Sequence, residues 1–116
     1  MKKLFSHAAL IAAGAALLLG ANVAQAMDDE DVVKLMKKNN CMKCHAPEKK
    51  KDGPSYKEIA AKMREKPAAE AEAEVLKHVT TFSKVEIKGK QEDHEPLKTK
   101  DEAEIAAVVK WILSRP

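Results

Sequence analysis

The sequence is poor in cysteine and in aromatic side chains. Its 116 residues include only two cysteines and four aromatic residues. Cys41 and Cys44 are separated by two residues, so a disulfide between them would close too small a loop to stabilise the chain much. The charges nearly balance, with 21 basic and 18 acidic residues. The sequence therefore lacks the basic excess that is typical of a nucleic-acid-binding protein.

The N-terminal segment has the composition of a secretory signal peptide. Two lysines follow Met1, residues 8–19 are apolar, and Ala24-Gln25-Ala26 has the small-x-small pattern of a cleavage site. A retained membrane anchor is the alternative, although the apolar run is short for a bilayer span. We therefore expect residues 1–26 to be a signal peptide and residues 27–116 to form one small mature domain.

The most specific pattern in the chain is Cys41-Met42-Lys43-Cys44-His45, which has the C-x-x-C-H spacing of a c-type haem attachment site. The thiols of Cys41 and Cys44 can add to the two vinyl groups of a haem and form thioethers. His45 follows directly, so its imidazole can ligate the iron from the proximal side. The pattern predicts one covalently bound haem c.

A C-x-x-C pair has two other known functions, which remain alternatives. It can be a redox-active dithiol or half of a zinc site. Zinc would need two further ligands at a similar short spacing, and the chain has no more cysteines. A thioredoxin-like dithiol would follow a strand, whereas the residues before Cys41 predict a helix.

The hydrophobic pattern predicts a mainly helical chain. Acidic residues at the start, an apolar stripe and two lysines near the end predict a first helix over residues 29–39. Ser55-x-x-Glu58 predicts a capping box that opens a short helix over residues 56–64. Pro67 is expected in the first turn of a third helix, which continues through Val79.

The segment between the third and the last helix is the least regular. Residues 84–88 alternate between charged and apolar side chains, which indicates a short extended piece or a hairpin around Gly89. Thr99-x-x-Glu102 predicts a second capping box at the start of the last helix. That helix has the clearest buried face in the chain, formed by Ile105, Val108, Val109, Ile112 and Leu113.

These patterns together resemble a small bacterial class I cytochrome c. The resemblance rests on the haem-attachment motif after an N-terminal helix, on Gly53-Pro54-Ser55-Tyr56 with the helix behind it, and on the C-terminal stretch Val109-Lys110-Trp111-Ile112-Leu113-Ser114. It implies an all-α fold in which the first and last helices pack together around one covalently bound haem. It also implies that the Pro54 carbonyl accepts a hydrogen bond from His45.

The chain departs from this family at the sixth position of the iron. The family usually takes that ligand from a methionine in the loop before the last helix, but this chain has no methionine after Met63. Its loop offers His94, two residues before a proline. We therefore predict bis-histidine ligation by His45 and His94. A second imidazole is a better donor to ferric iron than a thioether, so we expect a reduction potential below that of His/Met relatives.

Two alternatives to His94 ligation stay open. His94 can be an ordinary surface histidine between acidic residues, and His78 of the third helix is a rival ligand. Val75 and Val79 mark the buried face of that helix, so we expect His78 to point to solvent.

The resemblance implies a periplasmic electron carrier that passes single electrons between redox protein partners. We see no catalytic constellation, so we do not expect an enzyme. We also expect a monomer without membrane insertion of the mature chain, in which Lys43 and the run Lys49-Lys50-Lys51 could steer an acidic partner. One alternative is a haem-based gas-binding or sensor module with a displaceable distal ligand. The other is a haem subunit that docks on an enzyme.

Overall fold

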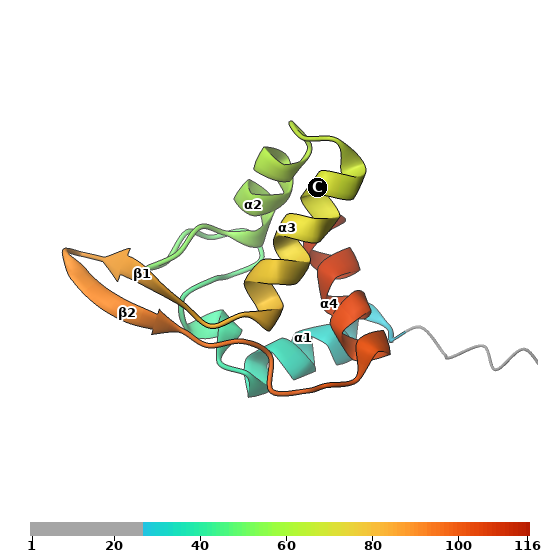
Figure 1. Ribbon diagram of the computed structural model, residues 1–116, viewed down its shortest axis with the longest axis horizontal. Helices are drawn as coiled ribbons and strands as arrows, with labels where there is room; N and C mark the ends of the chain where they lie inside the picture. Colours follow the sequence, from blue (N-terminus) through green and yellow to red (C-terminus); the bar gives the residue numbers. More distant parts are fainter. Residues whose placement is uncertain (1–26) are drawn as a thin grey trace, which may run out of the picture.

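The computed structural model describes residues 27–116, so the expected signal peptide lies outside the described residues. Four helices form the body of the domain, and one hairpin projects from its side (Figure 1). None of the helices in the described part is long and apolar enough to cross a membrane. The elements in chain order are α1 (Asp29–Lys38), a 3-10 turn η1 (Cys41–Lys43), α2 (Tyr56–Met63), α3 (Ala68–Thr80), β1 (Ser83–Ile87), β2 (Lys90–His94) and α4 (Glu102–Leu113).

The first two helices begin at side-chain caps. The Asp28 carboxylate accepts a hydrogen bond from the Asp31 backbone N–H at 2.8 Å, and the acidic first turn of α1 lies at the positive end of its dipole. At α2, Ser55 accepts from the Glu58 N–H while the Glu58 carboxylate accepts from the Ser55 N–H. The predicted capping box of α2 is thus confirmed.

The starts of α3 and α4 differ from the sequence-based predictions. Pro67 stands at the N-cap of α3 and the helix begins one residue later. The predicted Thr99 cap of α4 is wrong, because Asp101 is the N-cap and accepts hydrogen bonds from the N–H groups of Ala103 and Glu104. Thr99 instead places its hydroxyl between the Glu104 carboxylate and the Asp101 N–H. The closer carboxylate of Asp101 therefore takes the exposed helix N–H groups.

The core forms where α4 packs against the other three helices. The terminal helices α1 and α4 pack together, as the resemblance implies. Val32 and Met36 of α1 are 2% and 1% exposed, and Val108 of α4 is 1% exposed. Met63 at the end of α2 is also buried. The remaining buried apolar residues are Tyr56, Ala60, Ala71, Val75, Leu97, Val109, Trp111 and Ile112.

The hairpin is longer and more regular than the alternating residues 84–88 indicate. Its strands are antiparallel: Ser83 pairs with His94 at one end of the ladder, and Ile87 pairs with Lys90 at the other. Lys88 and Gly89 have φ values of 52° and 80°, so the two-residue turn has the left-handed backbone that suits the twist of a hairpin. His94 was expected on a loop, but it is the last residue of β2. The backbone ladder therefore fixes its position.

Candidate haem site

The two cysteines and His45 lie on one short turn. Asn40 ends the α1 segment in the left-handed conformation, at φ 61°, and redirects the chain into η1. The His45 N–H then donates to the Cys41 carbonyl at 3.1 Å. Both cysteines are free and partly buried. The turn thus groups two thiols and one imidazole in five consecutive residues, as covalent haem attachment requires.

The loop after His45 folds back beneath its ring. The Gly53 N–H donates to the Cys44 carbonyl at 2.8 Å, and the Tyr56 N–H donates to the Ala46 carbonyl at 2.9 Å. His45 Nδ1 lies 2.7 Å from the Pro54 carbonyl oxygen. Because a carbonyl oxygen only accepts, Nδ1 carries the proton and Nε2 keeps the lone pair with which imidazole binds iron.

Gly53 is the residue that lets the loop approach so closely. A Cβ on Gly53 would lie 2.7 Å from His45 Cε1 and 2.9 Å from His45 Nδ1. No real Cβ contact is this short, so any larger residue would displace the imidazole. The steric fit and the Pro54 carbonyl together set the orientation of the His45 ring.

Burial distinguishes Cys41 from a redox-active cysteine. Burial raises the pKa of the Cys41 thiol. Hydrogen bonds with the Cys41 backbone and the Tyr56 side chain act in the opposite direction but are smaller effects. Burial also raises the pKa of the adjacent Tyr56 hydroxyl. A reactive dithiol needs a lowered thiol pKa, because the thiolate is the nucleophile. The surroundings of Cys41 therefore do not suit a thioredoxin-like function.

The hairpin presents His94 to the same region. His94 pairs with Ser83 across the ladder, and directly opposed residues share one face of the sheet. That face also carries Val85 and Ile87, which are partly buried, and opposite them the exposed Glu92 and Lys90. One face of the hairpin thus combines an imidazole with two apolar side chains.

The rings of His45 and His94 lie close enough together for both to approach one metal ion. Their centroids are 6.3 Å apart and the ring planes meet at 68°. A metal between two imidazoles holds each ligating nitrogen at about 2 Å and the ring centres at about 6 Å. Within residues 27–116 no three histidine, cysteine or acidic side chains converge on one metal position. A haem iron needs only two protein ligands, so this pair suits it.

Two buried polar atoms in the described part of the chain lack hydrogen-bond partners, and both belong to this region. They are His94 Nδ1 and Trp111 Nε1. Trp111 stacks edge-on against Tyr56 at 5.3 Å, and Tyr56 lies 5.2 Å from the His45 ring. Buried polar atoms are normally paired. A partly polar group bound among these rings is consistent with both orphaned atoms.

His78 lies closer to His94 than the sequence pattern indicates. As a whole residue His78 is exposed, which agrees with the expectation that it points to solvent from α3. Its ring nevertheless packs against His94, with a centroid distance of 4.1 Å and a tilt of 47°. Burial lowers the pKa of both rings, and the neighbouring imidazoles lower it further. Both histidines are therefore neutral near pH 7, the form in which imidazole binds metals or accepts hydrogen bonds.

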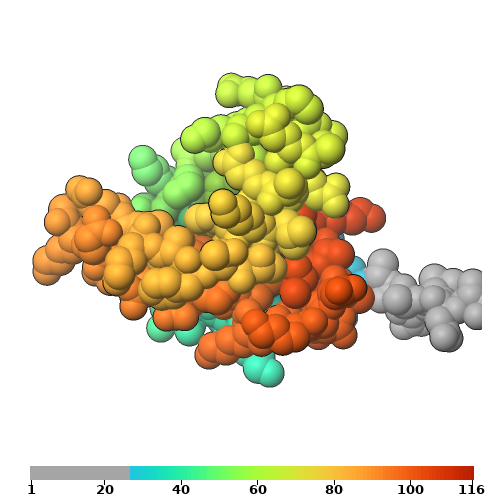
Figure 2. All heavy atoms as spheres, in the orientation of Figure 1, coloured from blue at the N-terminus to red at the C-terminus, as the bar shows by residue number. Residues whose placement is uncertain are grey.

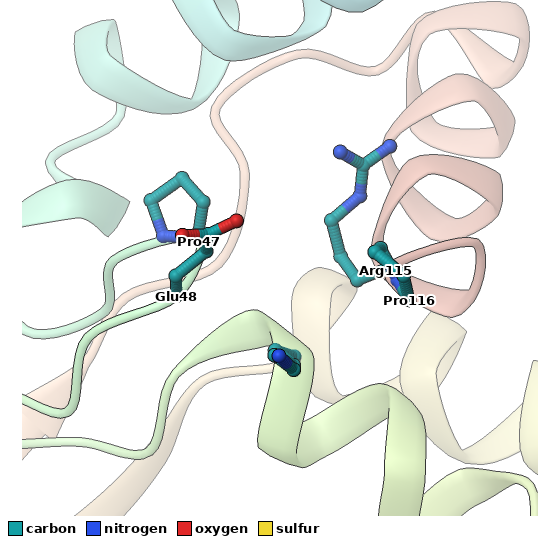
Figure 3. Close-up of a pocket in the computed structure, with 5 residues that line it drawn as sticks. Pro47, Glu48, Arg115 and Pro116 are labelled. Atoms are coloured by element: carbon teal, nitrogen blue, oxygen red, sulfur yellow. The ribbon is translucent and has the colours of Figure 1, made fainter.

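A separate surface pocket lies away from these rings. Figure 3 shows Pro47 and Glu48 facing the end of the chain, where Arg115 and Pro116 complete the wall. The fifth lining residue is Lys57 at the start of α2. None of the histidines or cysteines lines this pocket, so we do not connect it with the haem site.

Sequence reasoning missed several contacts that hold the site together. Asn39 was expected only as a helix stop, but its side-chain oxygen accepts from the Lys98 N–H at 2.9 Å and so joins the end of α1 to the segment after the hairpin. The Leu97 N–H donates to the Val79 carbonyl at 2.8 Å. The steric need for glycine at position 53 and the His78–His94 contact were also missed. No local pattern signals contacts between residues so distant in sequence.

The described residues are similar to known cytochromes c. Residues 29–116 match the family described as Cytochrome c. Cytochrome c-551 of Pseudomonas aeruginosa is 43% identical over 56 residues, which are 48% of this chain and 54% of that protein. The matched part thus spans about half the length of this curated relative.

Solved structures extend the similarity over nearly the whole domain. Class 1 cytochrome MtoD from Sideroxydans lithotrophicus ES-1 is 46% identical, with a TM-score of 0.65, and the match covers 76% of this chain and 97% of that one. Wild-type cytochrome c552 of Nitrosomonas europaea is 32% identical, with a TM-score of 0.55. The match covers 72% of this chain and 99% of that one. Proteins of this family carry one covalent haem c and transfer electrons. The chain belongs to the cytochrome c family and has the class I fold.

Proposed function

We propose that this chain is a periplasmic carrier of single electrons whose haem iron is held by His45 and His94. The family membership and the free thiols of Cys41 and Cys44 support one covalent haem. The bound haem supplies a one-electron couple between ferrous and ferric iron. The signal-peptide composition of residues 1–26 supports export to the periplasm.

The 6.3 Å separation of the His45 and His94 rings is the observation that carries the ligand assignment. His45 Nδ1 is engaged by the Pro54 carbonyl, which leaves Nε2 for the iron. His94 ends β2, and the partner strand β1 offers the partly buried Val85 and Ile87 on the same face of the hairpin. These apolar side chains suit a porphyrin face.

The proposed ligand pair has a consequence for the reduction potential. A second imidazole donates more electron density to ferric iron than a methionine thioether does, and it thereby stabilises the oxidised state. We therefore expect the wild-type potential to be below that of a His94→Met variant of the same chain. The comparison keeps the proximal site, the charge and the fold constant.

Exposed lysines offer a docking surface for redox partners. Lys43, Lys49 and Lys50 are exposed close to the haem-attachment turn. Lys51 belongs to the same run, but its ammonium group donates to the Met42 carbonyl at 2.8 Å and so has a structural contact. We propose that the first three steer an acidic partner in a small, weak encounter. An electron-transfer rate that is indifferent to ionic strength would rule this out.

Visible spectroscopy of the reduced holoprotein with carbon monoxide tests the ligand assignment. Wild type is expected to keep its six-coordinate spectrum, because His94 occupies the site that carbon monoxide needs. His94→Ala is expected to bind carbon monoxide readily. Glu95→Ala, which changes an exposed neighbour of His94 at the end of the hairpin, is the matched control and is expected to behave like wild type.

Two results would contradict the proposal. Ready binding of carbon monoxide by wild type would mean an open or loosely held iron and would favour a gas-binding function. A His94→Ala variant that stays closed would assign the sixth position to another residue.

A further inference from the structure

The distal histidine has a second ring nitrogen that nothing in the proposed ligation uses. One nitrogen of His94 binds iron in the proposed arrangement, and the other is expected to carry a proton. Ligating histidines almost always donate this second N–H to a carboxylate, carbonyl or water, which fixes the ring and increases its basicity. The Pro54 carbonyl has this function at His45. At His94 the buried Nδ1 has no hydrogen-bond partner among residues 27–116.

The His78 imidazole is the polar side chain packed against His94. The two ring centroids are 4.1 Å apart, whereas the centroid of the His45 ring is 6.3 Å from that of His94. Rotation of the His78 ring about its side-chain bonds, together with a slight separation of the two rings, would align one nitrogen of each. A neutral imidazole has one acceptor nitrogen and one N–H. His78 can therefore accept the N–H that His94 offers.

The backbone holds these two histidines in place from separate elements. His78 lies in the last turns of α3, and His94 ends β2. The hydrogen bond from the Leu97 N–H to the Val79 carbonyl joins the residue after His78 to the segment just after β2. On the face seen in Figure 2, this hairpin extends from the body beside α3. A side-chain contact at its base would thus add rigidity where the hairpin has little other support.

We propose that His78 is a positioning residue, which accepts a hydrogen bond from the second ring nitrogen of His94 and holds the distal imidazole on the iron. This inference rests on the proposed axial ligation by His94. The hydrogen bond would slow detachment of the ligand and, by increasing its donor strength, lower the reduction potential. The distal side would then have a counterpart of the His45–Pro54 contact, made by a side chain instead of a carbonyl.

The test compares His78→Leu with His78→Gln in the holoprotein. Leucine removes the acceptor, whereas the glutamine carbonyl oxygen restores one at a similar distance from the helix. Leu76→Gln, an uncharged change at an exposed position of the same helix, is the matched control. The measurements are the rate of carbon monoxide binding to the ferrous protein, the midpoint potential and the low-spin ferric spectrum.

We expect His78→Leu to keep the six-coordinate spectrum but to bind carbon monoxide about tenfold faster, with a higher midpoint potential. His78→Gln is expected to return both quantities toward wild type, and Leu76→Gln to leave them unchanged. Equal rates and potentials in wild type and His78→Leu would overturn the positioning function while leaving His94 ligation intact. An open iron in His78→Leu together with a closed iron in His94→Ala would make His78 the ligand itself and overturn both proposals.

Discussion

The two sides of the haem site hold their histidines by different means. On the proximal side, His45, Gly53 and Pro54 lie within ten residues of one another, and the ring is fixed by a close steric contact and a 2.7 Å hydrogen bond. On the distal side, His94 is 49 residues away in the sequence, at the base of the hairpin where β2 ends. Its ring contacts His78, and its Nδ1 has no hydrogen-bond partner in the described part of the chain. The proximal ligand is thus rigid by local construction, whereas the distal ligand depends on contacts between separate elements.

This difference indicates which of the two histidines exchanges more readily. A ligand held by its own loop returns to the iron after any fluctuation, because the loop cannot move without breaking several backbone hydrogen bonds. A ligand at the base of a hairpin can detach when that hairpin moves relative to the body. We therefore expect the distal histidine to determine ligand exchange and potential, and the proximal turn to determine whether the holoprotein forms.

Removing each ligand in turn should give the largest contrast. His45→Ala is expected to yield little stable holoprotein, because the iron loses the ligand that the attachment turn positions. His94→Ala should accumulate haem-loaded protein with an open site. The measurement is the haem content and folded yield of both variants expressed in parallel. Equal losses of haem content and folded yield in the two variants would contradict the proposed difference between the proximal and distal histidines.

The glycine beneath the proximal ring provides the next test. Gly53→Ala places a methyl group against His45 Cε1 and should lower the free energy of unfolding by about 1–3 kcal/mol, the usual cost of overpacking. The change should also alter the visible spectrum, because the ring must move. Denaturant unfolding of the holoprotein measures the stability.

Gly89→Asn is the control for this change. Gly89 has φ +80° but open space around its Cβ position, and asparagine tolerates the left-handed region. We expect Gly89→Asn to lower the free energy of unfolding much less than Gly53→Ala does, and to leave the visible spectrum unchanged. A larger cost at Gly89 than at Gly53 would contradict the steric argument.

The distal histidines should make stability depend on pH. Burial, with the charges of neighbouring imidazoles, lowers the pKa of both His78 and His94. Below the ordinary histidine pKa of about 6.5, the unfolded chain therefore binds more protons than the folded one. The free energy of unfolding should be at its full value above that pH and fall as the pH drops toward the folded pKa values.

Thermal unfolding of wild type and His78→Gln between pH 8 and pH 5 measures this dependence. The variant lacks one of the two shifted groups, so its midpoint should fall less steeply on acidification. Identical profiles would show that the His78 ring is not neutral in the folded protein.

The smallest effects are expected from the exposed ion pairs of the hairpin. Lys84 pairs with Asp93 across the strands at 2.7 Å, and Lys88 at the tip lies 3.6 Å from Asp52 of the proximal loop. Exposed pairs of this kind contribute under about 1 kcal/mol. Asp52→Asn and Asp93→Asn should each lower stability by less than that, and the effect should disappear in high salt. A loss of several kcal/mol from either change would mean that the hairpin depends on its charges.

The sequence predicts the proximal side far better than the distal side, for a physical reason. Cys41, Cys44 and His45 are consecutive or nearly so, and the capping box of Ser55 and Glu58 is also local. The helix faces with Val32 and Met36, and with Val108 and Ile112, follow from a 3.6-residue period. All of these depend on short-range geometry.

Elements that depend on tertiary contacts were less predictable. The N-cap of α4 shifted from Thr99 to Asp101, because two oxygen-bearing side chains compete for the same N–H groups and only the fold decides between them. The strand position of His94 and its contact with His78 depend on the register of the hairpin and on how α3 packs. A sequence pattern carries no direct signal for either.

The most direct test of the distal assignment is the electron paramagnetic resonance and near-infrared magnetic circular dichroism of the ferric wild-type holoprotein, which distinguish two axial imidazoles from an imidazole and a thioether. We predict a low-spin spectrum of two imidazoles, which is lost in His94→Ala and changes to the imidazole–thioether form in His94→Met. A high-spin five-coordinate spectrum, or an imidazole–thioether spectrum in the wild type itself, would contradict the assignment of His94 to the iron.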